Sequence, residues 1–241
     1  MAEQTHRSDP QVLNRRTLER DHRILAGMLR PGMSVLDVGC GTGAITAGIA
    51  AAVAPGDVVG IDRDAGMLPP GSLPNLRFEA QDALTMEFDR RFDIVTAARS
   101  LQWMADPAAA LQRMARYGRV VVVLDYNHRD NAWSPGPPPE FVRFYSAFLA
   151  WREANGWDNA IADHLPGLFA QAGLTDIETH ISDEIDGRGA DIWLHVIESI
   201  GPKFLTEAER AAAAEACGAY IRTRLDRQVL AMRTVTGRAA V

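Results

Sequence analysis

The sequence of 241 residues predicts an α/β fold in which helices cover both faces of a mainly parallel sheet. Five short β-rich runs alternate with helical runs through the first half of the chain. The first of these runs leads into a glycine-rich turn and then a helix, an order typical of ligand-binding crevices at the carboxyl ends of parallel strands. Hydrophobic residues make up 47% and charged residues 23% of the chain, as in ordinary globular proteins.

The elements of the first half follow from local patterns. Two helices are expected at residues 44–54 and 108–116, and a short helical turn at residues 64–68. The second helix follows Asp106-Pro107, because aspartate is a favoured N-cap and proline is favoured at the first helical position. The five strands are expected at residues 34–38, 57–61, 75–79, 92–96 and 119–125.

A proline-rich segment at residues 135–139 separates this alternating region from the second half. Beyond it we expect strands at residues 174–181 and 228–236, which return the chain to the sheet. The helical segments of the second half are expected at residues 141–151, 161–173, 190–200 and 206–224. The resulting division is an N-terminal helical cap, residues 1–30, and a main domain, residues 31–241. Helical insertions at about residues 131–160 and 188–225 are expected to form a lid.

Composition narrows the possible functions. The formal charge of −6 is opposite to that of most nucleic-acid-binding proteins, so a nucleic-acid partner is not expected. Lys203 is the single lysine, which excludes a P-loop and a dehydrogenase of the Tyr-x-x-x-Lys type. Cys40 and Cys217 offer no metal-binding spacing, so no metal is expected. No apolar run approaches the roughly 20 residues that span a bilayer, and the polar N-terminus lacks a secretory signal. We therefore expect a cytoplasmic protein away from membranes; the oligomeric state stays open.

The glycine-rich turn carries the most specific signal. Asp37 precedes Gly39, Gly41 and Gly43, and the three glycines are expected to face the crevice because glycine permits close backbone approach and positive φ. Asp62 closes the second expected strand roughly 20 residues later, where an acidic side chain accepts hydrogen bonds from both hydroxyls of a ribose. Asp82 follows the third strand.

These motifs resemble those of the class I S-adenosylmethionine-dependent methyltransferases, in particular the small-molecule branch that includes the ubiquinone and menaquinone biosynthesis enzymes. The resemblance extends from Val35 to about Asp125, and Asp37-x-Gly39-x-Gly41-x-Gly43 matches the family's loop without a gap. The resemblance implies a Rossmann-like seven-stranded sheet whose last strand is antiparallel, with residues 174–181 and 228–236 as the sixth and seventh strands.

The resemblance also implies the cofactor, S-adenosylmethionine, and the residues that hold it. The loop, including Cys40, would lie under the methionine part, and Asp62, with Arg63 beside it, would meet the ribose. Asp82 and the Ala83 amide would hold adenine. The segment Arg99-Ser100-Leu101-Gln102-Trp103 would line the sulfonium and the entry of the acceptor, which implies Arg99 as a cofactor residue and Trp103 as a substrate residue.

Two other functions stay open from the residues. Gly39-x-Gly41-x-x-Ala44 also satisfies a dinucleotide fingerprint, so an NAD(P)-dependent oxidoreductase is a rival, although Gly43, Asp37 and the lack of a hydride-transfer dyad count against it. A cofactor-binding regulatory or partner-dependent protein without its own activity is the other. The turn after the fourth strand lacks the motifs of DNA methyltransferases, so the expected acceptor is a small organic molecule, with a protein acceptor as the open alternative.

Candidate acceptor-site residues are fewer. The aromatic-rich segment 133–157 has the composition of a small-ligand pocket, and Tyr145 is its selected member, although such helical spacing more often reflects ordinary packing of a cap on the sheet. His128 follows the fifth strand on the expected ligand side and is the candidate to orient or deprotonate the acceptor; its alternative is a strand-end residue that points into solvent. His22 is expected on a solvated helix face.

Overall fold

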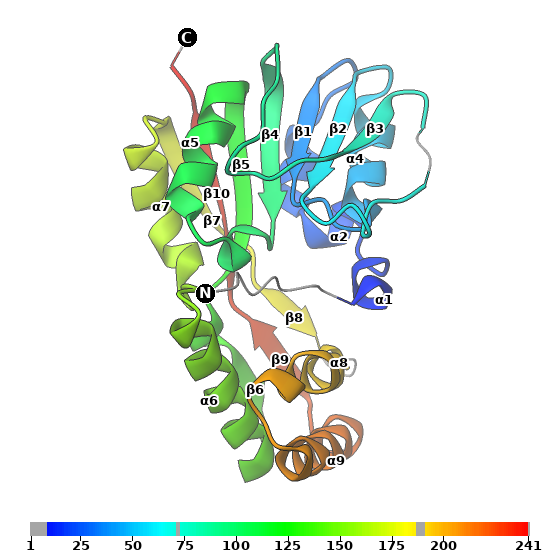
Figure 1. The fold of residues 1–241 in the computed structure, drawn as a ribbon, viewed down its shortest axis with the longest axis vertical. Coiled ribbons are helices and arrows are strands. Elements are labelled where there is room, and N and C mark those ends of the chain that lie inside the picture. The colour runs from blue at the N-terminus through cyan, green and yellow to red at the C-terminus, as the bar shows by residue number, and fades with distance from the viewer. Residues whose placement is uncertain (1–8, 71–72, 187–190, 241) are drawn as a thin grey trace.

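The computed structural model describes residues 9–70, 73–186 and 191–240, and its core is a twisted seven-stranded sheet (Figure 1). The strand order is β3-β2-β1-β4-β5-β10-β7. β10 runs antiparallel to both of its neighbours, β5 and β7, while the pairs from β3 through β5 are parallel. The expected seven-stranded methyltransferase sheet with its last strand antiparallel is therefore confirmed. The strands are β1 (Val35–Val38), β2 (Val58–Asp62), β3 (Leu76–Ala80), β4 (Phe92–Ala98), β5 (Gly118–Tyr126), β7 (Thr175–Ile181) and β10 (Met232–Arg238).

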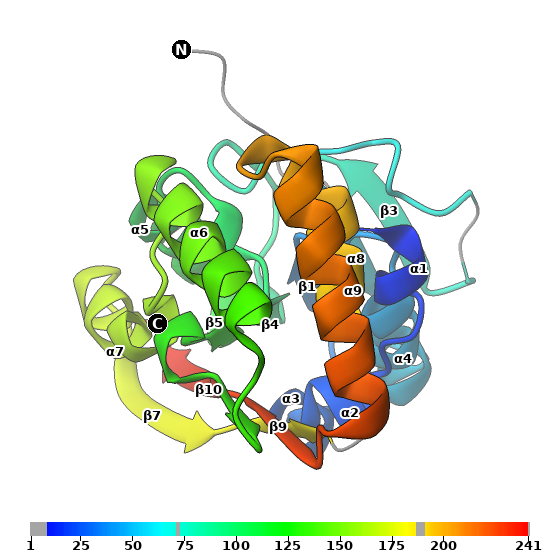
Figure 2. The ribbon, with the colours of Figure 1, turned by 90° about the horizontal axis from the view of Figure 1, so that it is seen from below.

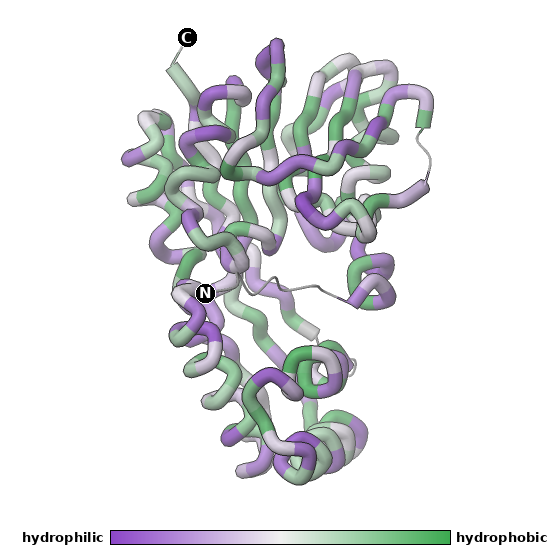
Figure 3. Tube along the Cα trace, in the orientation of Figure 1, coloured by the Kyte–Doolittle hydropathy of each residue, from purple (hydrophilic) through white to green (hydrophobic). Residues whose placement is uncertain are grey.

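Two helical layers bury the two faces of this sheet. On one face, α5 (Pro107–Tyr117) and α7 (Ile161–Gln171) pack over a core that includes Phe92, Leu111 and Phe169. On the other face, α2 (Leu18–Asp21), α3 (Arg23–Met28) and α4 (Ala44–Val53) pack over a core that includes Leu25 and Ile49. Figure 3 shows the central strands as predominantly hydrophobic, as expected for strands that are covered on both faces.

Local signals placed most of these elements within a few residues. The Asp106 side chain accepts a hydrogen bond from the Ala109 amide at 2.9 Å, with Pro107 at the first helical position. α4 and α5 begin within one residue of the predicted bounds. The prediction of a helical turn at residues 64–68 was wrong. The Asp62 carboxylate accepts a hydrogen bond from the Asp64 amide, and the Asp64 carboxylate accepts one from the Gly66 amide, which holds the segment in non-helical turns.

The N-terminal segment packs against the sheet instead of presenting a polar face to water. After α1 (Pro10–Leu13), the chain enters α2 and α3, and the His22 side chain between them is 1% exposed. His22 Nε2 lies 2.9 Å from the Thr96 hydroxyl, which donates to the Val122 carbonyl. The expectation that His22 is solvated was therefore wrong. The first eight residues of the expected cap lie outside the described residues.

The second half adds a lobe that the sequence only partly foresaw. Residues 228–236, expected as one strand, divide at Ala231 into β9 (Arg227–Leu230) and the start of β10. β9 pairs antiparallel with β6 (Ala132–Ser134) and β8 (Glu184–Asp186) in a separate three-stranded sheet. The insertions are thus not purely helical, because β6 lies at the start of the first insertion and β8 and β9 flank the second.

Helices complete this lobe. α6 (Pro139–Ala154), α8 (Ile192–Ser199) and α9 (Glu207–Thr223) share an aromatic core. Figure 2 shows these three helices from below. Gln228 Oε1 of β9 accepts hydrogen bonds from both Trp133 Nε1 and Trp193 Nε1, at 3.0 and 2.6 Å. The lobe is therefore one packed unit beneath the carboxyl ends of the main parallel strands (Figure 1). Within the described ranges, no helix has the length and apolar character needed to cross a membrane.

Candidate functional site

The glycine turn between β1 and α4 adopts the backbone geometry that its composition predicts. Gly39, Gly41 and Gly43 have φ of 72°, 54° and 73°. A Cβ on Gly39 would lie 2.6 Å from Ser100 Oγ, and one on Gly41 would lie 2.9 Å from Leu13 Cδ1. Side chains are thus excluded from this turn by both backbone conformation and neighbouring atoms.

Gly43 departs from the expectation that all three glycines face the crevice. It does not line the cleft beside the turn, and a Cβ there would lie 2.5 Å from Phe78 Cζ. Its role in this structure is to let the start of α4 pack on β3. Gly43 is therefore corrected from a crevice-facing residue to a packing residue of the loop.

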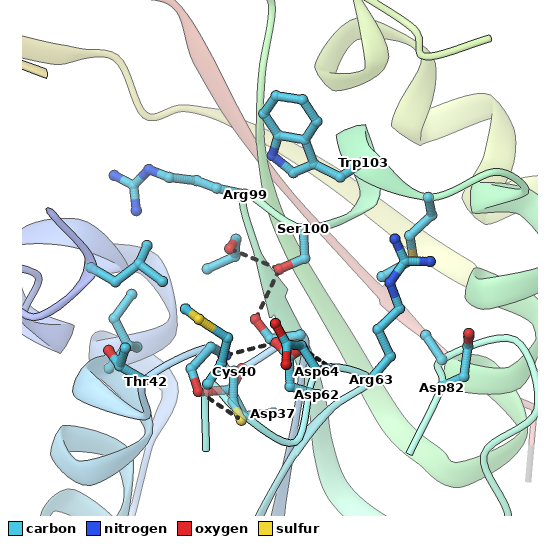
Figure 4. A pocket seen from close by; sticks show the side chains of 18 of the residues that line it. Asp37, Cys40, Thr42, Asp62, Arg63, Asp64, Asp82, Arg99, Ser100 and Trp103 are labelled. Carbon is cyan, nitrogen blue, oxygen red and sulfur yellow. Dashed lines mark hydrogen bonds between the residues drawn. The ribbon is translucent and has the colours of Figure 1, made fainter. Parts of the chain in front are cut away.

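A cleft of about 630 Å³ lies over the turn and the carboxyl ends of β1, β2 and β4; we call it the loop cleft. Figure 4 shows Asp62, Asp64 and Cys40 gathered at its floor, with Arg99 and Trp103 across it. Among the predicted cofactor residues, all except Gly43 line it. The lining includes Leu13, Arg16, Asp37, Gly39, Cys40, Gly41, Thr42, Asp62, Arg63, Asp64, Met67, Gln81, Asp82, Ala83, Arg99, Ser100, Trp103 and Met104.

Asp37 is the most buried carboxylate of the loop cleft, at 4% exposed. Its Oδ2 accepts a hydrogen bond from the Thr46 hydroxyl at 2.7 Å, which links β1 to α4. Burial raises the pKa of Asp37 to about 6, and the nearby Asp62 charge acts in the same direction. A positively charged ligand group near Asp37 would stabilise its ionised form.

Asp62 connects the end of β2 to the glycine turn. Its Oδ2 accepts a hydrogen bond from the Gly41 amide at 2.9 Å, and its Oδ1 accepts one from the Asp64 amide at 3.0 Å. Each carboxylate oxygen has a second lone pair that can serve a ligand hydroxyl. At the neighbouring strand end, Asp82 Oδ1 accepts from the Leu84 amide at 2.8 Å. Both side chains are therefore oriented by backbone amides before any ligand binds.

Arg99 follows β4 with a φ of 59°, an uncommon conformation for a residue other than glycine. Its Nη2 lies 3.4 Å from Asp21 Oδ1 and 3.3 Å from Glu184 Oε2, and its Nε donates to the Tyr126 hydroxyl at 3.0 Å. These contacts connect the N-terminal helices, the main sheet and the second lobe. The strained backbone thus places a buried cation where the three parts meet.

A second, smaller cavity of about 110 Å³ opens between the sheet and the second lobe; we call it the aromatic chamber. Arg16, Arg99, Leu13 and Trp103 line both cavities, so the two adjoin there. The remaining lining includes Val12, Gln102, Tyr126, His128, Asn131, Phe148, Ile192, Trp193, His195, Val196, Ile200 and Leu230.

His128 lies in the wall of the aromatic chamber and is 6% exposed, so it does not point into solvent. Gln102 Nε2 donates to the Arg99 carbonyl at 3.2 Å, which leaves Gln102 Oε1 to face His128 Nε2 at 2.6 Å. Nε2 must therefore carry the proton, and Nδ1 is a buried acceptor without a partner among the described residues. Burial, with the Arg152 charge, lowers the pKa of His128 well below its ordinary value. The imidazole is neutral and present as one tautomer.

Arg152 contacts two residues of this wall, Trp103 and Gln102. It is fully buried, lies 4.3 Å from the centroid of the Trp103 ring and donates to the Gln102 carbonyl at 3.1 Å. Burial lowers the pKa of Arg152 to about 10. It stays cationic at neutral pH, lies against the Trp103 ring that lines both cavities and holds the Gln102 backbone.

Tyr145, predicted as a substrate residue, does not line the aromatic chamber. Its hydroxyl donates to the His128 carbonyl at 2.6 Å and accepts from Asn131 Nδ2 at 2.8 Å. Tyr145 is half-buried on α6 and packs against the aromatic core of the second lobe. It is therefore corrected to a supporting residue of His128 and Asn131.

Sequence reasoning missed Arg16, Gln102 and Arg152. Arg16 belongs to no motif, Gln102 lay inside a selected segment without a role of its own, and Arg152 sits on a helix that was read for its aromatic residues. Nothing in local spacing distinguishes them from solvated polar residues. Within the described part of the chain, no group of three or more potential metal-ligating side chains is present.

Comparison with known proteins gives a consistent result. Residues 35–119 match the family described as "Methyltransferase domain". A trans-aconitate 2-methyltransferase of Methylobacterium radiotolerans is 33% identical over 63% of this chain and 58% of its own length. A demethylmenaquinone methyltransferase of Staphylococcus aureus is 38% identical over 43% of this chain and 47% of its own length. The chain thus matches about half of the length of these relatives.

A solved structure shows the same fold. Phosphoethanolamine N-methyltransferase 2 of Haemonchus contortus, in complex with S-adenosyl-L-methionine, superposes with a TM-score of 0.55. The two chains are 15% identical, and the match covers 92% of this chain and 53% of the other. At this identity, the likeness concerns the fold alone.

Proposed function

Because this chain belongs to the class I S-adenosylmethionine-dependent methyltransferases, we propose that it transfers the methyl group of S-adenosylmethionine to a small organic acceptor. The observation that carries this proposal is the junction of two cavities of different character. The loop cleft has paired carboxylates and a glycine turn, whereas the aromatic chamber has apolar walls with a few polar groups. A cofactor and an acceptor need such adjoining sites.

The residues of the loop cleft fit the cofactor. Gly39, Cys40 and Gly41 would lie beneath its methionine part, and Asp62, next to Arg63, would accept hydrogen bonds from its ribose hydroxyls. Asp82 and the Ala83 amide would hold adenine. Asp37 and Arg99 would contribute one negative and one positive charge near the methionine end. When bound, the cofactor supplies an electrophilic methyl on a cationic sulfur.

Methyl transfer is an in-line displacement, so the protein acts mainly by alignment and exclusion of water. Trp103 borders both cavities and is buttressed by Arg152, so it would align the acceptor against the methyl. His128 would orient the acceptor by accepting a hydrogen bond at Nδ1. Its lowered pKa makes it a weak base, which favours orientation over deprotonation.

The N-terminal cap and the second lobe would close the site. α1 contributes Leu13 to both cavities and α8 contributes Ile192 and Val196 to the aromatic chamber. We expect protection from hydrogen exchange to increase in α1, α6 or α8 when S-adenosylhomocysteine binds. Equal exchange with and without this ligand would reject a ligand-coupled lid.

The enzymatic proposal is tested with purified protein, S-adenosylmethionine and a panel of carboxylic acids, phenols, alcohols and amines. Formation of S-adenosylhomocysteine that depends on an acceptor is expected. Binding of the cofactor without turnover on any acceptor would instead support a regulatory protein. Calorimetry with NAD and with S-adenosylmethionine separates this proposal from the oxidoreductase alternative. We place the reaction in the cytoplasm and without a nucleic-acid partner.

A further inference from the structure

We propose that the methyl acceptor is a carboxylate, bound by Arg16 at the junction of the loop cleft and the aromatic chamber, and that the product is its methyl ester. This inference rests on the proposed methyltransferase function and specifies its substrate class. Its basis is a cation that has no hydrogen-bond or ion-pair partner among the described residues, at the point where acceptor and methyl donor would meet.

Arg16 lies in the connection between α1 and α2 and lines both cavities. Its guanidinium makes no hydrogen bond or ion pair with the described residues, whereas the neighbouring Arg15 pairs with Asp191 at 2.6 Å and Arg20 pairs with Asp21 at 3.0 Å. A guanidinium has five donors in a fork that matches a carboxylate. Arg16 thus presents an unused anion-binding group to the cavities.

The nearby carboxylates of Asp21 and Glu184 attract Arg16 without contacting it, because their oxygens contact Arg99 instead. Asp21 and Glu184 both contact Arg99 Nη2, at 3.4 and 3.3 Å. Burial lowers the pKa of Arg16, and the like charge of Arg99 acts in the same direction. A bound anion would reverse this repulsion and would also be attracted by Arg99. The junction is therefore suited to a negatively charged group.

The walls define the rest of the acceptor. Trp103, Phe148 and Trp193 line the chamber of about 110 Å³, so its walls suit the apolar body of a small acceptor. Asn131, His195 and Ser199 add polar groups, and the Asp9 carboxylate, which also lines the chamber, lies 3.2 Å from His195 Nδ1. The expected ligand is consequently a small acid with an apolar body, not a polyanion or a long chain.

A carboxylate also removes the need for a base. Carboxylic acids are ionised at neutral pH, so a carboxylate oxygen can attack the methyl carbon directly with its own lone pair. The oxygen–carbon bond forms while the carbon–sulfur bond breaks, and the bonding electrons neutralise the sulfonium. No proton moves in this step. A neutral His128 with a low pKa is compatible with this chemistry but unsuited to deprotonating an alcohol.

A carboxylate at Arg16 could come from two molecules, because the cofactor carries one on its methionine end. Arg16→Met separates them when S-adenosylhomocysteine affinity and acceptor kinetics are measured on the same protein. We expect the dissociation constant for S-adenosylhomocysteine to stay within about threefold of wild type, while kcat/KM for the acid falls about 10²-fold. An equal loss in both quantities would assign Arg16 to the cofactor and overturn the acceptor proposal.

The acceptor class is tested with tritiated S-adenosylmethionine and benzoate, cinnamate and phenylacetate, each beside its amide, with cinnamyl alcohol, phenol and benzylamine as further comparisons. Methyl esters release volatile methanol in mild alkali, whereas ethers and N-methyl products do not. Alkali-labile product from at least one acid, and none from its amide, is expected. Turnover confined to alcohols, phenols or amines would overturn this inference while the methyltransferase proposal stands, and no turnover in the whole panel would reject both.

Arg23→Met is the matched control. Arg23 begins α3 in the same N-terminal segment, is exposed, and lines neither the loop cleft nor the aromatic chamber. The substitution removes the same charge, so a general electrostatic effect would lower activity in both variants. Wild-type kinetics are expected for Arg23→Met, and an equal decrease in the two variants would overturn the assignment of Arg16.

Discussion

Replacing Asp62 with alanine should weaken binding of S-adenosylhomocysteine without unfolding the protein. In the structure, the Asp62 carboxylate already accepts the Gly41 and Asp64 amides at 2.9 and 3.0 Å, which holds both oxygens at the floor of the loop cleft. The remaining lone pairs are expected to receive the two ribose hydroxyls. Asp62→Ala therefore removes the ribose contacts and releases the glycine turn.

The magnitude follows from the number and kind of these bonds. A hydrogen bond to a charged group contributes about 1.5–3 kcal/mol, so two correspond to about 3–6 kcal/mol, or roughly 10²- to 10⁴-fold in affinity. Asp62 is half-buried, and solvent competition favours the lower end. We expect about a 10²-fold increase in the dissociation constant for Asp62→Ala. Asp62→Asn should give a smaller loss, because its amide retains one acceptor oxygen.

Isothermal calorimetry with S-adenosylhomocysteine measures this loss, and thermal unfolding of the free protein checks the fold. Asp57→Ala is the control, because Asp57 precedes the same strand at its opposite end and is an exposed carboxylate paired with Arg90 at 3.0 Å. Affinity close to wild type is expected for the control. If Asp62→Ala also bound within threefold of wild type, the ribose assignment and the reasoning from strand-end position would both fail.

Three further predictions follow from packing, titration and the chamber wall. Gly43→Ala should lower the free energy of unfolding by at least about 1–2 kcal/mol, since φ is 73° and the new Cβ would meet Phe78. Adding Phe78→Leu to this variant should recover part of the loss in urea titrations. An unchanged unfolding midpoint for Gly43→Ala would contradict the packing role. The pKa of His22 is lowered to about 3 by burial, so its contribution to stability is complete above about pH 6.5 and is lost as the pH falls toward 3. Relative to His22→Gln, the wild type should lose up to about 1.4 kcal/mol per pH unit in that range, and parallel pH profiles would refute this. His128→Ala should lower kcat/KM about 10- to 10²-fold with S-adenosylhomocysteine affinity preserved, and an equal loss of both would assign His128 to the cofactor wall.

Local sequence was sufficient for the sheet and the glycine turn. The five parallel strands and the helices between them depend on contiguous patterns, such as Asp106-Pro107 at the start of α5, which act through neighbouring backbone groups. The turn from Gly39 to Gly43 required positive φ at three positions, and glycine is the residue that adopts it at low cost. Asp62 and Asp82 could be placed because strand ends in a parallel sheet meet at one edge.

The acceptor side depended on contacts between residues far apart in the chain. β6 pairs with β9 across about 95 residues and β8 with β9 across about 44, and strands of three or four residues carry too little pattern to be recognised alone. Trp103 borders the chamber because it is packed against Arg152, and the tautomer of His128 is set by Gln102, whose amide is oriented by the Arg99 carbonyl. The strand pairings and the contacts of Trp103 with Arg152 and of Gln102 with His128 join elements that are far apart in the sequence, so local patterns do not reveal them.

Arg16 illustrates the same division most clearly. In the sequence it is one of several arginines in a polar N-terminal segment, and its neighbours Arg15 and Arg20 are ordinary ion-paired residues. Tertiary structure brings it beside Arg99, whose contacts occupy the nearby carboxylates, and leaves its guanidinium at the junction of two cavities. The residues of the loop cleft could be predicted from the sequence, because local backbone geometry determines the glycine turn and the strand ends. Acceptor recognition was not, because it arises from which charges remain unpaired after distant elements have packed together.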